Sequence, residues 1–511
     1  MNTPLQRLRN WLPANGQPDN DIASPDALRQ WIGTLDDAAP LDRAAAMSSR
    51  LLPLVSGQHN LHMRTRLLDV FEEAAHKVLP ALEDEIRNAP VPLTPQVKAQ
   101  ALTADNLLKA LIKGYLSVVS GIDGGALPPP LLQHVILRAM YALRRRQMLA
   151  YRAYATPSAS SWRQLHELHG VARSCGMSKV SKNSLSIEHI YIVSLLLAYA
   201  NPSKFPRADL DALCACADRM SSLVSLAETG DVAGSEAPAH LFLVRTDEGH
   251  PGAPFLRTPT ASSPPHGLIV DCDEVVAALV EEIALRADQD AACAAMLPQI
   301  AVPMLETLLQ MWGSQPTRRF ARTRFKPRVD LVSSLPDVMQ LIAGEALRRR
   351  RDDARNPHER PAPPISEWAV IDESPDGFGI RYLKGPMRRL EVGEVIGLRS
   401  REHSRTHLCL VRRASNTGQA RFEIGLQDLS PDAQIVPLPH LEHASQRKAL
   451  LLPQLPAYGG ATGIIAMPGD LPAGLELTYR PAGIPIHLRL GRPVELNSRL
   501  EFYLLDEIEI N

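Results

Sequence analysis

The sequence predicts a multidomain α + β protein, with an all-α N-terminal region and a β-rich C-terminal third. Apolar residues recur at three- and four-residue steps from about residue 28 to residue 220, which is typical of amphipathic helices. Near the end of the chain they alternate with other side chains in short runs, which is typical of strands. The chain has 511 residues, of which 45% are hydrophobic, so it can bury a sizeable core and is not a disordered polymer.

The N-terminal region contains a clear amphipathic helix and a uniformly apolar one. In the segment LLDVFEEAAHKVLPALEDEI, one apolar stripe is formed by Leu68, Phe71, Ala75, Val78, Leu82 and Ile86. The run 190–200 is apolar on all sides, which predicts a central buried helix. This helix should end at Asn201, because Pro202 disfavours the helical conformation of the residue before it. The run is well short of the roughly 20 residues that span a bilayer, so we expect no transmembrane segment.

Between residues 237 and 271 the pattern changes to two strand-like pieces, HLFLV and GLIVD, separated by a loop rich in Gly, Pro, Ser and Thr. Helical periodicity returns from Glu274 to Trp312, and a further helix is expected from Val338 to Arg351. The proline-rich segment NPHERPAPPIS then forms a linker or a long loop. Short β-type runs, such as GLELTY and IPIHLRL, continue to the end of the chain.

The net charge of -1 hides two parts of opposite sign. The chain has 55 Lys and Arg against 56 Asp and Glu, so we expect no binding of DNA or RNA. Residues 316–430 nevertheless carry 22 Lys and Arg against 15 Asp and Glu, a net +7, and the remainder carries -8. Excess arginine on β-type sequence suggests an anionic ligand, because guanidinium pairs with phosphate and with the O6 and N7 atoms of guanine. A solvated basic surface is the alternative.

Two short motifs lie in this basic segment. The first is the RRxxR of residues 318–322, and the second is the DxSxxG of residues 372–377, which follows the apolar run 368–371. In this order they resemble the signature of the PilZ domain, a small β-barrel that binds the bacterial second messenger cyclic di-GMP. The later segments RRLEVGEVIGLR, CLVRRAS and FEIGLQDLS resemble further strands of that family. The resemblance covers about residues 317–430, under a quarter of the chain.

The resemblance implies an antiparallel β-barrel of about six strands, with the arginine-bearing segment lying across it. The expected domains are a helical domain at residues 1–230, a mixed segment with short strands and helices at 231–315, a PilZ-like β-barrel at 316–435 and a β-rich C-terminal extension at 436–511. About fifty positions separate Arg322 from Asp372, more than in the compact family pattern, so an insertion could keep the motifs apart or cover the site. A second RxxxR, from Arg324 to Arg328, is interpreted as strand.

The candidate ligand-binding residues are Arg318, Arg319, Arg322, Asp372, Ser374 and Gly377. By resemblance, the three arginines pair with phosphate or guanine and stack on the purine planes. Asp372 is the acceptor for the N–H groups of guanine, since an ionised carboxylate only accepts hydrogen bonds. Ser374 donates to a phosphate or orients the loop, and Gly377 permits a close approach or a positive φ. The alternative is an Asx-type turn closed by Gly377, with solvated arginines.

Six other residues occur in close pairs of histidine or cysteine, namely His59, His62, His166, His169, Cys214 and Cys216. We interpret the histidines as satisfied or exposed and the cysteines as buried small residues, because no third metal ligand accompanies them. The basic run 144–146 is interpreted as a solvated helix face. The sequence contains no phosphate-binding loop of the GxxxxGK[ST] type and no GxSxG motif. We therefore expect no enzyme, no metal and no cofactor.

These observations favour a cyclic di-GMP effector of the bacterial cytoplasm. Six cysteines without a CxxC pair, and a first segment without an apolar signal-peptide core, fit a reducing compartment. By resemblance, such effectors act on motility, type IV pili, surface attachment or exopolysaccharide, and we expect the helical region to bind an unidentified protein partner. The first alternative is a helical adaptor whose barrel binds protein and not nucleotide. The second is an enzyme that uses the histidines of the helical half.

Overall fold

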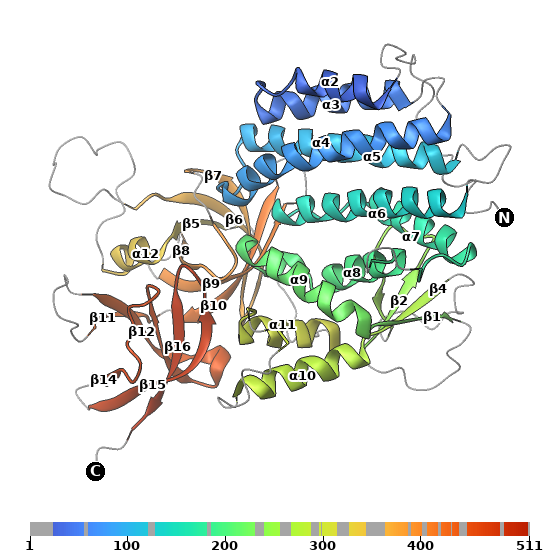
Figure 1. Ribbon diagram of the computed structural model, residues 1–511. Coiled ribbons are helices and arrows are strands. Elements are labelled where there is room, and N and C mark those ends of the chain that lie inside the picture. The colour runs from blue at the N-terminus through green and yellow to red at the C-terminus, as the bar shows by residue number, and fades with distance from the viewer. Residues whose placement is uncertain are drawn as a thin grey trace. The chain divides into compact units, whose positions relative to one another are not determined.

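The computed structural model describes residues 24–55, 60–120, 128–180, 185–229, 240–255, 267–287, 296–297, 299–313, 327–343, 363–386, 390–400, 406–416, 421–430, 432–438, 447–480 and 485–508. The chain forms two compact units (Figure 1). We call residues 1–89, 93–202 and 207–316 the helical unit. Residues 90–92, 203–206 and 317–511 are the β unit.

The helical unit begins with a series of α-helices, which confirms the predicted all-α N-terminal region. They are α2 (Pro25–Gly33), α3 (Pro40–Val55), α4 (Leu61–Asn88), α5 (Pro95–Ser120), α6 (Pro129–Arg152), α7 (Ala159–Ser174), α8 (Ile187–Tyr199) and α9 (Leu210–Met220). Several of them begin at a capping side chain; for example, Ser24, Asn60, Ser158 and Ser186 each accept a hydrogen bond from a backbone amide three residues later. α5 packs against α3, α4 and α6.

Helix α8 is the central buried helix that the uniformly apolar run predicts. Ile190, Leu195 and Leu196 are fully buried. The helix ends at Tyr199, and Asn201 follows with a φ of +56°, so the chain turns away before Pro202. Because α8 carries apolar side chains on every face, it is stable when other elements cover it on every side.

The mixed segment contributes a small antiparallel sheet and two helices to the helical unit. Its elements are β1 (Ser225–Glu228), β2 (Leu241–Arg245), β3 (Ala253–Pro254), β4 (Gly267–Asp271), α10 (Asp273–Ala287) and α11 (Val302–Gly313), with the strand order β1-β4-β2-β3. The predicted strands HLFLV and GLIVD are β2 and β4. The Phe242 ring stacks on Tyr199 of α8 at 4.0 Å, and Trp312 Nε1 donates to the Leu196 carbonyl at 3.0 Å. Of the helices that the structure describes, none is long and apolar enough to cross a membrane.

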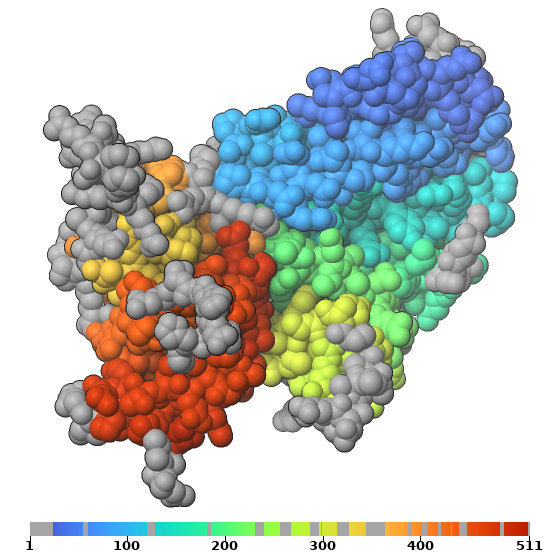
Figure 2. All heavy atoms as spheres, turned by 60° about the vertical axis from the view of Figure 1, so that its left-hand side comes forward, coloured from blue at the N-terminus to red at the C-terminus, as the bar shows by residue number. Residues whose placement is uncertain are grey.

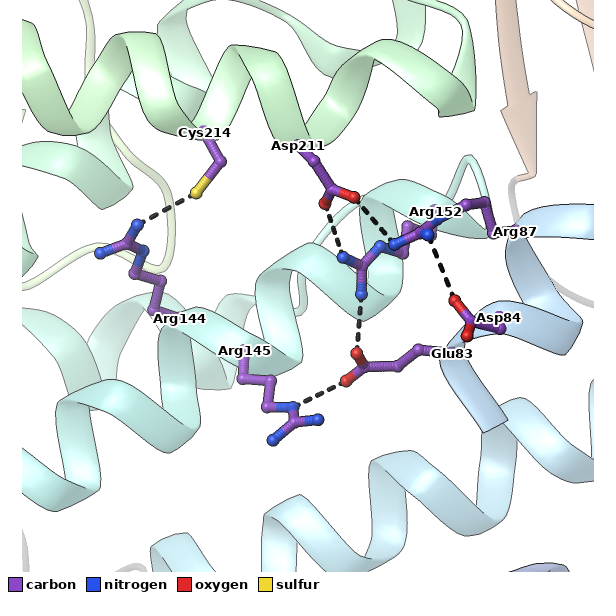
Figure 3. Close-up of polar contacts among 8 residues, drawn as sticks. All are labelled: Glu83, Asp84, Arg87, Arg144, Arg145, Arg152, Asp211 and Cys214. Atoms are coloured by element: carbon purple, nitrogen blue, oxygen red, sulfur yellow. Dashed lines mark hydrogen bonds and ion pairs between the residues drawn. The ribbon is translucent and has the colours of Figure 1, made fainter. Parts of the chain in front are cut away.

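Charged side chains link α4, α6 and α9 in what we call the α4–α6–α9 charge network (Figure 3). Glu83 of α4 accepts hydrogen bonds from Arg145 at 2.7 Å and from Arg152 at 2.9 Å. Asp211 of α9 accepts from Arg152 and from Arg87, each at 2.8 Å. Glu83 and Arg152 are each 8% exposed. The network therefore joins three helices through two nearly buried charges.

The interpretation of residues 144–146 as a solvated helix face was wrong. These three side chains are only 12% to 22% exposed. Their partners are Cys214 Sγ at 3.0 Å for Arg144, Glu83 at 2.7 Å for Arg145 and Asp105 at 2.5 Å for Arg146. Helix α6 packs against α4, α5, α7 and α8, so its basic positions face other helices. Acidic groups brought from distant parts of the sequence compensate their charge.

The β unit contains the closed six-stranded antiparallel barrel that the sequence predicts. Its strands are β5 (Arg328–Ser333), β6 (Ser366–Ser374), β7 (Gly377–Lys384), β8 (Val395–Ser400), β9 (Thr406–Asn416) and β10 (Phe422–Ser430). Neighbouring strands follow the order β10-β7-β6-β5-β8-β9, and the pairing of β9 with β10 closes the barrel. Val370, Ile380, Ile424 and Ala414 are successive register partners on four strands. All four are buried, so this row lies inside the barrel.

Helix α12 (Leu335–Ile342) covers part of the outer barrel face. It packs over Gly397 of β8, where an added Cβ would lie 2.8 Å from Leu341 Cδ2, so glycine makes room for the helix. The predicted helix from Val338 to Arg351 is described only as far as this element, and residues 344–351 lie outside the described residues.

The C-terminal extension is a six-stranded antiparallel sheet, which confirms the predicted β-rich tail. Its strands are β11 (Gln434–Pro437), β12 (Lys448–Leu455), β13 (Ala461–Ala466), β14 (Glu476–Tyr479), β15 (Ile486–Leu496) and β16 (Glu501–Glu507), in the order β11-β12-β13-β16-β15-β14. Leu410 and Val395 of the barrel share one buried cluster with Leu450 and Phe502 of this sheet. Figure 2 shows the same packing, with the red spheres of the sheet directly against the orange spheres of the barrel.

The turn between β15 and β16 packs against the loop that precedes β8. Asn497 Nδ2 donates to the Gly393 carbonyl at 3.1 Å. The Arg499 guanidinium lies 3.4 Å from a carboxylate oxygen of Glu394 and 3.8 Å from one of Glu391, and both glutamates are 4% exposed. Burial raises the pKa of Glu394 to about 7, because the cost of desolvating the carboxylate outweighs the attraction of Arg499.

The β unit should lose stability as the pH rises from about 5 to about 8. The pKa of Glu394 is higher in the folded chain than its ordinary 4.5, so the folded state holds this proton more tightly. The contribution is complete below pH 4.5 and is lost as the pH rises through about 7. The full shift corresponds to about 3 kcal/mol. Hydrogen exchange of β8 and β16 amides in denaturant measures the loss across this pH range.

The Glu394→Gln variant should remove most of this pH dependence, because the amide has no proton to release. The matched control is Glu476→Gln in β14, an exposed position, which should keep the pH dependence of the natural chain. If Glu394→Gln loses as much stability with rising pH as the natural chain does, another group is responsible and the prediction is wrong.

Candidate ligand-binding site

The DxSxxG residues form the turn of the β6–β7 hairpin. Ser374 and Gly377 are register partners, so Pro375 and Asp376 make a two-residue turn, and Ser374 Oγ donates to the Gly377 carbonyl at 3.3 Å. Gly377 has a φ of +148°, and an added Cβ would overlap the carbonyl oxygen of Leu426 on β10. Only glycine fits both the backbone conformation and this close approach.

Asp372 lies on the outer face of the barrel, just after an irregularity in β6. The register shifts between Val370 and Asp372, so one extra residue is accommodated there. Asp372 then pairs with Gly379 of β7, and its half-buried carboxylate lies over that glycine, where an added Cβ would be 2.9 Å from Asp372 Cγ and would overlap Oδ1. The missing side chain of Gly379 is what lets the carboxylate lie flat on the sheet.

The same row continues across two more strands. Gly379 pairs with Gly425 of β10, and Gly425 pairs with Arg413 of β9. A Cβ added at Gly425 would lie 3.5 Å from Cβ and 3.6 Å from Nε of Arg413, so the exposed arginine lies along this second glycine. We call Asp372, Gly379, Gly425 and Arg413 the glycine row. It has a carboxylate at one end and a guanidinium at the other, and the two positions between them, on β7 and β10, are glycines without side chains.

Two neighbouring arginines are already paired. The Arg381 guanidinium of β7 lies 2.7 Å from the Glu423 carboxylate of β10. This pair is two residues along each strand from the Gly379–Gly425 pair. Arg412, next to Arg413 in the chain, donates to Gln427 at 2.7 Å, to Glu495 at 2.9 Å and to Tyr458 at 3.1 Å. Within the described part of the chain, no hydrogen bond or ion pair engages the Arg413 guanidinium.

The structure thus brings half of the predicted site residues together. Asp372, Ser374 and Gly377 lie on one hairpin at the outer face of the barrel. The other three, Arg318, Arg319 and Arg322, lie outside the described residues. Arg328, the end of the alternative RxxxR, belongs to β5 and donates to Glu367 at 2.8 Å.

Sequence reasoning missed the rest of the glycine row. The available signal was a glycine inside each of the strand segments GFGI and FEIGL, since a glycine within a strand often marks a close approach of another group. That signal does not say which group approaches. Only the register of β7, β10 and β9 connects Gly379 and Gly425 with Arg413.

The paired histidines of α7 have structural environments. His166 Nδ1 lies 2.8 Å from the Tyr191 hydroxyl and its Nε2 lies 3.0 Å from the His250 carbonyl. His169 stacks on Tyr191 at 3.9 Å. Burial lowers the pKa of His166 to about 4 and that of His169 to about 3, so both are neutral near pH 7. Among the described residues, no group of three His, Cys, Asp or Glu side chains could hold a metal ion.

Comparison with known proteins identifies the family. Residues 26–230 match the N-terminal domain of the cyclic-di-GMP receptor FimW, and residues 337–435 match the middle PilZ domain of the same receptor, so the two matches cover more than half of the chain. The chain belongs to the FimW family. FimW of Pseudomonas aeruginosa is 22% identical over 517 residues, which cover 87% of this chain and 84% of that protein. No solved structure matches the chain.

The FimW matches confirm the resemblance to a PilZ-domain receptor with a long helical N-terminal region. The match to the middle PilZ domain begins within α12 and ends within β11, so it contains β6 to β10 and the whole glycine row. β5 and the RRxxR of residues 318–322 precede the matched range.

Proposed function

We propose that this member of the FimW family is a receptor for cyclic di-GMP. The observation that carries the proposal is the arrangement of Asp372, Ser374 and Gly377 on one hairpin at the outer face of a closed six-stranded barrel. This hairpin lies within the range matched by the PilZ domain of a cyclic-di-GMP receptor. A cyclic dinucleotide of guanine needs cations for two phosphates, donors for O6 and N7, and an acceptor for the N1 and N2 hydrogens.

Each described residue fits one of these needs. The Asp372 carboxylate accepts the N1 and N2 hydrogens of a guanine, and Gly379 beneath it makes room for the carboxylate on the outer face of the sheet. The Ser374 hydroxyl, which now donates to the Gly377 carbonyl, is placed to turn toward a phosphate. We include Arg318, Arg319 and Arg322 in the proposal as the cationic segment that closes over the ligand.

The proposed output is a binding switch without a catalytic step. Ligand binding neutralises the arginine segment and fixes it on the barrel, and this changes the contacts of α11, which precedes the segment in the chain. The helical domain (residues 1–230), with the mixed segment 231–315, then signals to a protein partner that controls motility, pili, surface attachment or exopolysaccharide. The barrel (316–435) senses the ligand and the extension 436–511 supports it. The site of action that we propose is the bacterial cytoplasm.

Calorimetric titration of the full chain with cyclic di-GMP tests the proposal. We expect binding at micromolar concentrations, and Asp372→Ala should raise the Kd at least about tenfold. A hydrogen bond to a charged group contributes about 1.5–3 kcal/mol, and about 1.4 kcal/mol is a factor of ten. The matched control is Asp376→Ala, which removes the same charge from an exposed position of the same turn and should leave the Kd within about twofold.

The outcomes separate the function from the site. Absence of heat with the natural chain would overturn the receptor proposal and favour the helical adaptor, whose barrel binds protein. Binding that Asp372→Ala and Arg322→Ala both leave unchanged would keep the receptor and overturn the assignment of these residues.

A further inference from the structure

The end of the glycine row opposite Asp372 carries an arginine with unused hydrogen-bonding capacity. Arg413 is exposed on β9, and its side chain lies along Gly425 with Nε 3.6 Å from the position of an added Cβ. Its five N–H donors have no acceptor among the described residues. An exposed arginine alone indicates only a solvated surface, but here a glycine on the neighbouring strand provides the space in which the side chain lies.

The arrangement of the neighbouring strands explains why Arg413 has no partner among the residues that the structure describes. The register between β9 and β10 shifts at Gly425 and Leu426, so Arg412 and Arg413 are both accommodated opposite this point. Arg412 binds Gln427 and two residues of the C-terminal sheet. The carboxylate of Glu423, two residues before Gly425 on β10, is engaged by Arg381. The site therefore holds one guanidinium whose charge no described carboxylate neutralises.

The side chains at the two ends of the row lie over adjacent strands, β7 and β10. Gly379 and Gly425 are register partners on antiparallel strands, whose Cβ positions are about 5 Å apart. The Asp372 carboxylate lies over the first glycine and the Arg413 side chain over the second. An acceptor and a donor group thus lie over adjacent strands on the same outer face. A purine base that binds above these two side chains can contact both.

Guanine has complementary groups on the corresponding edges. Its N1 and N2 hydrogens are donors, and its O6 and N7 atoms are acceptors that an arginine contacts with two hydrogen bonds. Asp372 accepts from the first pair and Arg413 donates to the second. Adenine carries an amino donor in place of O6, so it would meet the arginine with the wrong group.

We propose that Arg413 is a ligand-contacting specificity residue, which donates to O6 and N7 of the guanine whose N1 and N2 hydrogens Asp372 accepts. This proposal rests on the proposed cyclic di-GMP receptor function and deepens it. It assigns one guanine to the glycine row.

The test uses the full chain and four proteins: the natural chain, Arg413→Ala, Arg413→Lys and Arg492→Ala. Arg413→Ala should raise the Kd for cyclic di-GMP about tenfold, since a bidentate contact to guanine is worth about 1–3 kcal/mol. Lysine should restore only part of the affinity, because an ammonium group cannot make the paired contact. Arg492 is an exposed arginine of β15 and serves as the charge control, with a Kd within about twofold of the natural chain.

A second ligand identifies the atom that is contacted. The 7-deazaguanine analogue of cyclic di-GMP lacks the N7 acceptor, so it should bind the natural chain several-fold more weakly than cyclic di-GMP. This penalty should shrink in Arg413→Ala, which has already lost the contact. An equal penalty in both proteins would overturn the guanine contact, and an unchanged Kd in Arg413→Ala would overturn any ligand contact. Failure of the natural chain to bind cyclic di-GMP would instead overturn the receptor function on which the proposal rests.

Discussion

Replacing Gly377 with alanine should destabilise the β unit by about 3 kcal/mol and abolish ligand binding. The residue has a φ of +148°, and a side chain in such a conformation costs about 1–3 kcal/mol. The added Cβ would also lie 2.9 Å from the carbonyl carbon of Leu426 and 3.0 Å from Gln427 Cα. Because these are backbone atoms of the next strand, β7 and β10 must separate, and the register pair Gly377–Gln427 would be lost.

Thermal unfolding and hydrogen exchange measure this effect. For a unit of this size, about 3 kcal/mol lowers the Tm by about 6–12 °C. Exchange of β7 and β10 amides should accelerate, while that of the helical unit stays unchanged. The control is Gly459→Ala, because Gly459 has a φ of +68° but no heavy atom within 4 Å of an added Cβ. It should cost only about 1 kcal/mol. Equal destabilisation by the two substitutions would show that the contact with Leu426 has no effect.

Helices and strands were predictable from the sequence where the local pattern of apolar residues determines the secondary structure. The run 190–200 is apolar all round, and α8 is buried all round, since few other environments accept such a segment. The β-type segments became barrel strands β8, β9 and β10 as expected. The helix expected at Val338 begins three residues earlier, because Ser334 caps it by accepting a hydrogen bond from the Asp337 amide.

The site was predictable only where its residues are contiguous. Asp372, Ser374 and Gly377 belong to one turn, so their spacing already indicates that they act together. Arg413 reaches the same surface through β10, and no local pattern contains the register of strands that are distant in sequence. The interpretation of the basic run 144–146 as a solvated helix face was wrong for the same reason. Its own segment carries no acids, and the compensating Glu83 and Asp105 come from other helices.

Replacing Glu83 with alanine should destabilise the helical unit by about 3–5 kcal/mol, the largest effect that we expect from a single side chain of that unit. Glu83 holds Arg145 at 2.7 Å and Arg152 at 2.9 Å (Figure 3). Burial lowers the pKa of Arg152, but its hydrogen bond to Asp211 and the charge of Glu83 outweigh that effect and keep the pKa above its usual value. Without Glu83, a guanidinium that is 8% exposed would lose one of its two carboxylates, and breaking a buried pair costs this much.

A substitution in the same helix provides the comparison. Glu73 of α4 pairs with Lys77 at 3.2 Å, but both side chains are more than 60% exposed. Water and salt screen that pair, so Glu73→Ala should change the free energy of unfolding by less than about 0.5 kcal/mol. Denaturant unfolding of both variants measures the difference. If the two glutamates prove equally dispensable, water must reach Arg152 in solution, and the α4–α6–α9 charge network would add no more than a surface ion pair. If only Glu83 matters, burial is what gives the network its strength, because both substitutions remove the same charge and the same number of atoms.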